Sequence, residues 1–161
     1  MKDPYVFDFL DLKQEAREKE LEEALINNIT KVLLELGKGF AYVGHQYHLE
    51  VAGEIYYVDL LLYNIKLKCY VVIELKIGEF KPEYVGKMNF YLSLLDKLEK
   101  APDENPSIGI ILCAEKDHLE VELALQDVNK PIGVAEYQYL LPKNKLQELV
   151  ADEIKKSMKT E

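Results

Sequence analysis

The sequence predicts an α/β protein in which helices flank a mixed central β-sheet. Three observations predict this fold class. Some segments carry apolar residues at helical spacing, others alternate with a period of two or are continuously apolar, and the two kinds follow in the order α-β-β-β-α-β, then α-β-α. Three strands joined by short connections favour antiparallel pairing, whereas a strand reached through a crossover helix favours parallel pairing, so the sheet is expected to contain both.

The first helix is predicted over residues 15–36. Its apolar residues recur every three or four positions, and Gly37 and Gly39 end it. These apolar residues are Leu21, Leu25, Ile26, Ile29, Val32, Leu33 and Leu36. The mixed residues 1–14 before the helix are expected to be an entry segment that packs on another part of the protein.

Three strands are predicted next, because the apolar period changes to two from residue 40. They are expected at residues 40–51, 55–63 and 69–76, with a turn at 52–54 and a short connection at 64–68. If the hairpin of the second and third strands is centred on that connection, opposite residues have numbers that sum to about 133.

Helices and strands alternate in the second half of the chain. Gly78 ends the third strand, and Pro82 suits the first turn of a helix predicted over residues 82–99. Asp117 suits the N-cap of a later helix. The remaining predicted elements are a buried strand at 107–114, a helix at 117–128, a strand at 132–139 and an amphipathic helix from 142 to about 157.

The composition is that of an ordinary globular domain, with 161 residues, 48% of them hydrophobic and 30% charged. No apolar run approaches the roughly 18 residues that span a bilayer, and no apolar leader follows Met1. A cytoplasmic protein without membrane contact is therefore expected. Cys69 and Cys113 lie in apolar runs, which predicts buried, unpaired thiols rather than a disulfide.

The net charge of −9 is unlike that of a typical nucleic-acid-binding protein, which presents a basic face. The excess of acidic residues lies at the two ends of the chain, however, and residues 38–100 carry as many basic as acidic side chains. Bound divalent cations would offset the carboxylates of this middle part. The alternative is that its lysines form a solvated surface, and composition alone favours that interpretation.

Three charged residues interrupt apolar strands, where unpartnered charges are costly to bury: Asp59, Glu74 and Lys76. Glu74 and Lys76 share one face of their strand, and the predicted hairpin register places Asp59 opposite Glu74. Two carboxylates about 4.5–5.5 Å apart at Cβ repel unless one is protonated or a cation lies between them. The spacing therefore suggests a Mg²⁺ site, with Lys76 positioned to orient a water or stabilise a phosphate. A structural ion pair at a sheet edge is the alternative.

Glu22 is a fourth candidate, because it lies on the apolar stripe of the first helix with Leu25, Ile26 and Ile29. From there its carboxylate could reach a metal ion or the waters around it. The alternative is that Glu22 lies at the edge of the stripe and extends to solvent. The sequence contains no glycine-rich phosphate loop and no Gly-x-Ser-x-Gly elbow.

Asp59, followed by Val72–Lys76, resembles the motif of the PD-(D/E)xK nuclease superfamily. More closely, the chain resembles an uncharacterised nuclease-like domain found at the C-terminus of bacterial and archaeal two-domain proteins. The segments that carry this closer resemblance are 33–40, 57–61, 73–78, 88–92 and 109–113. The resemblance runs from about residue 2 to residue 143.

This resemblance implies a restriction-endonuclease-like αβββαβ core over residues 15–143, followed by a C-terminal helix and tail over 144–161. It also implies hydrolysis of phosphodiester bonds in nucleic acid, with DNA the expected substrate and Mg²⁺ (or Mn²⁺) the cofactor. Carried over, Asp59 and Glu74 are metal ligands, aided by the carbonyl of Leu75. Lys76 becomes the catalytic lysine.

Other positions are carried over in the same way. Glu22 matches the acidic residue of the first helix in the superfamily. Lys87 falls where relatives often have glutamine, and with Tyr91 it is assigned to substrate binding. His45 stands where arginine is common, and Val58 replaces the proline that gives the motif its name. Members usually have a separate N-terminal domain, so a partner domain of a longer protein is expected.

Two alternatives remain open. The chain could keep this fold as a module that binds nucleic acid or protein without cleaving it, which the net charge of −9 favours. It could also form a homodimer through strand faces rich in tyrosine.

Overall fold

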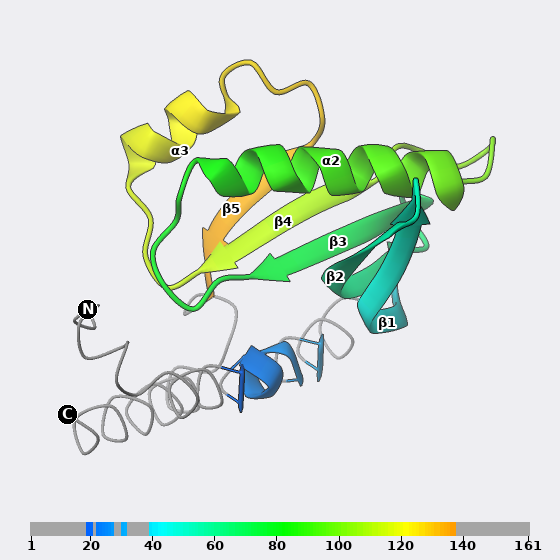
Figure 1. Cartoon of the computed structure of the whole chain (residues 1–161), viewed down its shortest axis with the longest axis horizontal. Coiled ribbons are helices and arrows are strands. Elements are labelled where there is room, and N and C mark those ends of the chain that lie inside the picture. The colour runs from blue at the N-terminus through cyan, green and yellow to red at the C-terminus, as the bar shows by residue number, and fades with distance from the viewer. Residues whose placement is uncertain (1–18, 21, 28–29, 32–38, 138–161) are drawn as a thin grey trace.

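A mixed five-stranded sheet forms the centre of the molecule in the computed structural model, which describes residues 19–20, 22–27, 30–31 and 39–137. The strands are β1 (Phe40–Val51), β2 (Glu54–Asn64), β3 (Cys69–Leu75), β4 (Ile108–Cys113) and β5 (Ile132–Glu136), adjacent in that order (Figure 1). The first three are antiparallel, and β4 and β5 add in parallel. This is the predicted α/β architecture.

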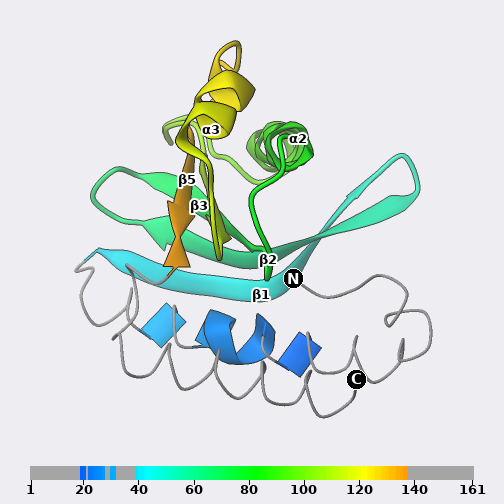
Figure 2. The same ribbon diagram turned by 90° about the vertical axis from the view of Figure 1, so that its left-hand side faces the viewer.

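Helices cover both faces of the sheet. Helix α2 (Glu83–Leu98) and helix α3 (His118–Leu125) lie on one face, and the helical residues 22–27 lie on the opposite face (Figure 2). Helix α2 is the crossover between β3 and β4 that parallel pairing requires. Among the described residues, no helix combines the length and apolar character needed to cross a bilayer.

The element boundaries agree with the predictions to within a few residues. Within the helix predicted over 15–36, every residue that the structure describes is helical, namely 19–20, 22–27 and 30–31. Helix α3 is shorter than the predicted 117–128, and its Asp117 cap is confirmed because the carboxylate accepts a hydrogen bond from Glu120 N at 2.9 Å. The predicted entry segment 1–14 and the helix from 142 lie outside the described residues.

The hairpin between β2 and β3 has the predicted register, since Leu60 pairs with Ile73 and Asn64 with Cys69. The β1–β2 connection is tighter than predicted. It consists of Ala52 and Gly53, both at positive φ (53° and 80°), as in the mirror-image two-residue turns that match strand twist.

Two apolar layers hold the helices on the sheet. One contains Leu25, Ile26 and the strand residues Leu60 and Ile73, and the other lies beneath α2. The members of the second layer include Val58, Leu61, Val72, Met88, Leu92, Leu95 and Ile111. Because both faces of β3 are covered, its sequence is apolar at consecutive positions. Cys69 and Cys113 are both free and buried, as predicted.

Candidate functional site

The site lies where β2 and β3 separate. Their backbone pairing ends at Leu60 and Ile73. Beyond this pair, backbone N–H groups donate to carboxylate side chains of the opposite strand. Glu74 Oε2 accepts a hydrogen bond from Asp59 N at 2.6 Å, and Asp59 Oδ2 accepts one from Leu75 N at 2.8 Å. Asp59 and Glu74 therefore lie close together, as predicted, and each carboxylate is held by a backbone N–H of the opposite strand.

Along β2, side chains stop alternating strictly between the two faces of the sheet next to Asp59. Val58 and Leu61 both pack in the layer beneath α2, whereas Leu60 packs on the opposite side with the N-terminal helical residues. Three positions separate Val58 from Leu61, so strict alternation would have placed them on opposite faces. The Asp59 carboxylate accordingly lines the cavity under the N-terminal helical residues, rather than pointing towards α2.

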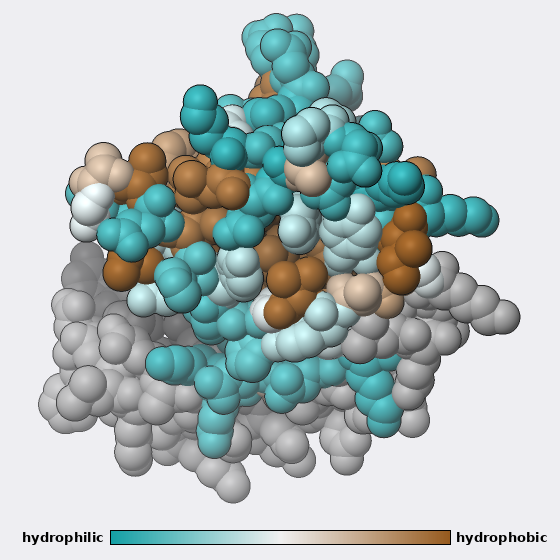
Figure 3. Space-filling model, turned by 90° about the vertical axis from the view of Figure 1, so that its right-hand side faces the viewer, coloured by the Kyte–Doolittle hydropathy of each residue, from teal (hydrophilic) through white to brown (hydrophobic). Residues whose placement is uncertain are grey.

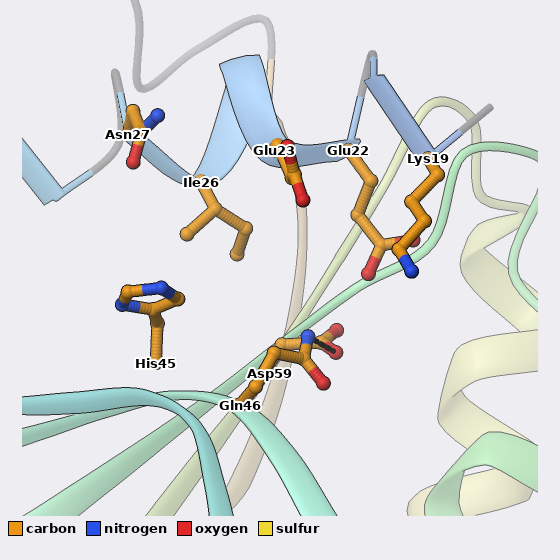
Figure 4. A pocket seen from close by; sticks show the side chains of 8 residues that line it. All are labelled: Lys19, Glu22, Glu23, Ile26, Asn27, His45, Gln46 and Asp59. Carbon is orange, nitrogen blue, oxygen red and sulfur yellow. Dashed lines mark hydrogen bonds between the residues drawn. The ribbon is translucent and has the colours of Figure 1, made fainter. Parts of the chain in front are cut away.

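That cavity has a volume of about 570 Å³ and lies between the helical residues and the strands (Figure 4). Figure 4 shows Lys19, Glu22 and Glu23 extending from the helix towards Asp59, with Gln46 beside it. Of the described residues, those that line it are Lys19, Glu22, Glu23, Ile26, Asn27, His45, Gln46 and Asp59. Glu22 thus reaches inward, as the helical spacing suggested, and does not simply extend to solvent.

The carboxyl groups of the site hold protons unusually tightly. Burial, reinforced by the nearby Asp59 carboxylate, raises the pKa of Glu74 to about 8, and only 6% of this residue is exposed. Burial and the nearby Asp59 carboxylate likewise raise the pKa of Glu22 to about 7. Burial also raises the pKa of Asp59, against the opposing effects of Leu75 N–H and Lys76.

Two lysines face these carboxyls. Lys76 Nζ lies 4.6 Å from the ring centroid of Tyr84 on α2, and its charge lowers the pKa values of Glu22, Asp59 and Glu74. The cation–π contact keeps the ammonium group at the open end of β3.

Lys87 projects from α2 near the same carboxyls. Its Nζ lies 5.8 Å from the ring centroid of Tyr91, and its charge lowers the pKa values of Asp59 and Glu74. Tyr91 is only 4% exposed, and Lys87 lies over its ring. Any role of Tyr91 in substrate binding therefore acts through Lys87.

The donor chemistry of the site suits a hard divalent cation. Its carboxylate oxygens, from Glu22, Asp59 and Glu74, are ligands that Mg²⁺ accepts, and the raised pKa values show that the site favours added positive charge. Within the described ranges, no three His, Cys, Asp or Glu side chains form a ready-made metal cage. Mg²⁺ commonly takes only one or two carboxylates and keeps several waters, so these residues fit that ion.

Sequence reasoning missed Gln46. Its Nε2 donates to Asp59 Oδ1 at 3.3 Å, and the signal available was only its place in the strand before Asp59. Lys19, Glu23 and Asn27 were missed as well, because they line the cavity from helix positions that look solvent-facing in the sequence. His45 lines the cavity as an exposed side chain, and its Nδ1 is hydrogen-bonded to the Tyr42 hydroxyl.

A family model and a curated protein both match this chain over most of its length. The family model described as the YhcG PDDEXK nuclease domain matches residues 1–154. The curated protein YhcG of Escherichia coli (strain K12) is 41% identical over 154 residues, which cover 96% of this chain and 40% of that protein. The chain thus spans about two fifths of the length of this relative.

Among solved structures, a protein of unknown function, AF1548, superposes with a TM-score of 0.51 at 13% identity, covering 77% of this chain and 65% of that one. A repair endonuclease from Pyrococcus abyssi has a TM-score of 0.47 at 16% identity, covering 68% and 45%. The likeness to AF1548 shows a shared fold.

Proposed function

The chain belongs to the family of YhcG PDDEXK nuclease domains, and from this premise we propose that it is a Mg²⁺-dependent (or Mn²⁺-dependent) nuclease that hydrolyses phosphodiester bonds in DNA. The observation that carries the proposal is the hydrogen-bonded pair Asp59 and Glu74 on neighbouring strands, with Lys76 directly after the end of β3. A sheet that needed only stability would gain little from buried carboxyls whose pKa values are raised.

In this proposal Asp59 and Glu74 hold the cation, with the carbonyl of Leu75 as a further ligand. Glu22, which lines the same cavity as Asp59, holds a water of the cation or a second ion. The cation supplies stabilisation of negative charge on the scissile phosphate and on the leaving oxygen. The hydrogen bonds from Asp59 N and Leu75 N orient the carboxylates before any ion binds.

Lys76 is the catalytic lysine of the proposal. Its ammonium group, held over the Tyr84 ring, is a donor for the attacking water and for a non-bridging phosphate oxygen. Lys87, kept in place by Tyr91, binds a neighbouring phosphate of the substrate backbone. The positive charges of Lys76 and Lys87 offset part of the repulsion between nucleic acid and a chain of net charge −9.

Cleavage assays test this proposal directly. Wild type, Asp59→Asn and Lys76→Ala are incubated with labelled single-stranded, duplex and branched DNA and with RNA, in Mg²⁺, Mn²⁺ or EDTA. We expect metal-dependent cleavage of DNA by wild type and a rate at least about 100-fold lower in both variants. Lys97→Ala, an exposed lysine at the other end of α2, is the matched control and should cleave like wild type.

The other outcomes are equally informative. Binding of nucleic acid without cleavage by any protein would replace the nuclease with the non-catalytic binding module. Cleavage of RNA alone would overturn the DNA assignment. Equal cleavage by all variants would indicate a contaminant and remove the support for the site.

Partners are part of the proposal too. Since the Escherichia coli relative is longer than this chain, we propose that a further domain selects the nucleic acid that the present residues cleave. Groups of apolar side chains lie among hydrophilic ones on the face seen in Figure 3, and Ile55 and Tyr57 of β2 are each about half exposed. A homodimer through such strand residues is the corresponding proposal for self-association, and sedimentation equilibrium tests it.

A further inference from the structure

Strand β1 is irregular where it passes the site. Its register against β2 shifts between Tyr42 and Gly44, and Gln46 has a φ of 47°, in the left-handed region that side-chain-bearing residues rarely adopt. His45 pairs with Leu60, and Tyr47 pairs with Val58 in the same register. Gln46 and Asp59, which lie opposite each other between these two pairs, are not paired. Strand irregularities of this kind commonly re-aim a side chain beside a functional site.

The irregularity aims the Gln46 side chain at Asp59. Gln46 Nε2 donates to Asp59 Oδ1 at 3.3 Å, while Leu75 N donates to Oδ2 at 2.8 Å (Figure 4). Each oxygen of this carboxylate therefore has its own donor, one from each neighbouring strand. Since a carboxylate oxygen can accept two hydrogen bonds, each oxygen keeps capacity for a further ligand.

We propose that Gln46 is a positioning residue that holds the Asp59 carboxylate in the orientation that binds a divalent cation. The inference rests on the proposed function, because the cation is the one that Asp59 and Glu74 hold there. Gln46 suits this role because an amide donor fixes the carboxylate without adding charge. A lysine or arginine at the same place would compete with the cation, and a carboxylate would repel Asp59.

A purely structural role fits the residue poorly. Gln46 is exposed on the cavity wall and belongs to neither apolar layer of the core. Its left-handed backbone works against folding, and glycine would adopt the same φ without a Cβ conflict. Replacing the side chain is therefore expected to change cation affinity much more than thermal stability.

The test measures Mn²⁺ affinity without nucleic acid, by electron paramagnetic resonance of the free ion, together with the metal-free Tm. Gln46→Met keeps the side-chain length and removes the amide, and Gln46→Gly removes it while relieving the backbone. Gln126→Met, at the exposed end of α3, is the matched control. We expect both Gln46 variants to bind Mn²⁺ at least about tenfold more weakly than wild type, as is typical when a partner of a metal ligand is removed.

The metal-free Tm of Gln46→Met is expected to match that of Gln126→Met, and Gln46→Gly is expected to be no less stable than Gln46→Met. Wild-type Mn²⁺ affinity in both Gln46 variants would overturn the positioning role. A wild-type chain that binds no Mn²⁺ would overturn both this inference and the metal-dependent nuclease. If wild type binds Mn²⁺ but cleaves nothing, the nuclease proposal fails, and the affinities of the Gln46 variants still decide the role of Gln46.

Discussion

Asp59 and Glu74 show how a sheet can accept two carboxylates at positions where backbone groups would otherwise pair. Each side chain accepts a hydrogen bond from a backbone N–H of the opposite strand, so the two residues proposed to hold the cation also use the hydrogen-bonding capacity of the open ladder. The cost is electrostatic, because the carboxyls are buried beside one another and their pKa values rise. This electrostatic cost falls when a carboxylate is protonated, and a cation bound between the carboxylates, as proposed for the metal-bound protein, would lower it too.

A pH dependence of stability follows from Glu74. Its folded-state pKa of about 8 lies above the ordinary value of 4.5, so the folded chain binds this proton more tightly than the unfolded chain does. The contribution is fully favourable below about 4.5 and is lost as the pH rises to about 8. The metal-free protein is therefore expected to lose stability over this interval.

Thermal unfolding in EDTA between pH 5 and pH 9 measures the effect. Glu74→Gln is expected to flatten the decline, with a smaller fall remaining from Glu22, whose pKa is about 7. Glu122→Gln, at an exposed position on α3, should follow wild type. A decline of the same slope in Glu74→Gln would show that this carboxyl is not its source.

At the level of elements, close packing of α2 on β4 sets the position of the helix that carries Lys87 and Tyr84. A Cβ built at Gly109 of β4 would lie 2.7 Å from Met88 Cγ and Sδ, so glycine permits the observed approach. Strand β3 ends at Leu75, and helix α2 begins after Pro82. The short connection brings the lysine that follows the strand and the aromatic ring of the helix together.

Gly109→Ala tests this packing. The added methyl group must displace Met88, and the expected loss is about 1–3 kcal/mol of unfolding free energy, visible as a Tm lower by several degrees. Gly86→Ala is the matched control, since nothing lies within 4 Å of a Cβ at that exposed helical position. There alanine is expected to stabilise the helix by up to about 1 kcal/mol. Equal Tm values for the two variants would contradict the close approach.

For the molecule as a whole, the layers on both faces of the sheet exclude water from the strand interiors. Both cysteines lie in these interiors, and burial raises the pKa of Cys113 to about 11. The thiolate is the reactive form, so the folded protein is expected to react slowly with a disulfide reagent at pH 8. Both thiols should react rapidly in denaturant. Rapid reaction of a thiol in the native protein would contradict its burial.

Much of the fold was predictable because its signals are local. Apolar periods and breaker residues placed the elements, and the short connection between β2 and β3 determined a register that brings Asp59 to Glu74. The first helix illustrates the same point, since the stripe that contains Glu22 directs its carboxyl inward. The strand pattern also singled out Lys76 as the companion of the two carboxylates, and the family motif then implied a catalytic role for it.

By itself, the sequence determined the order of the elements, the register between β2 and β3, and the charged residues where these two strands separate. These features depend on residues close together in the chain and on the short connection between the two strands. Only the tertiary structure decided that Asp59 turns towards the N-terminal helical residues and that Gln46 donates a hydrogen bond to it from a left-handed backbone. These features arise where strand alternation breaks under packing from both sides of the sheet, and no local pattern of residues encodes such a compromise between distant elements.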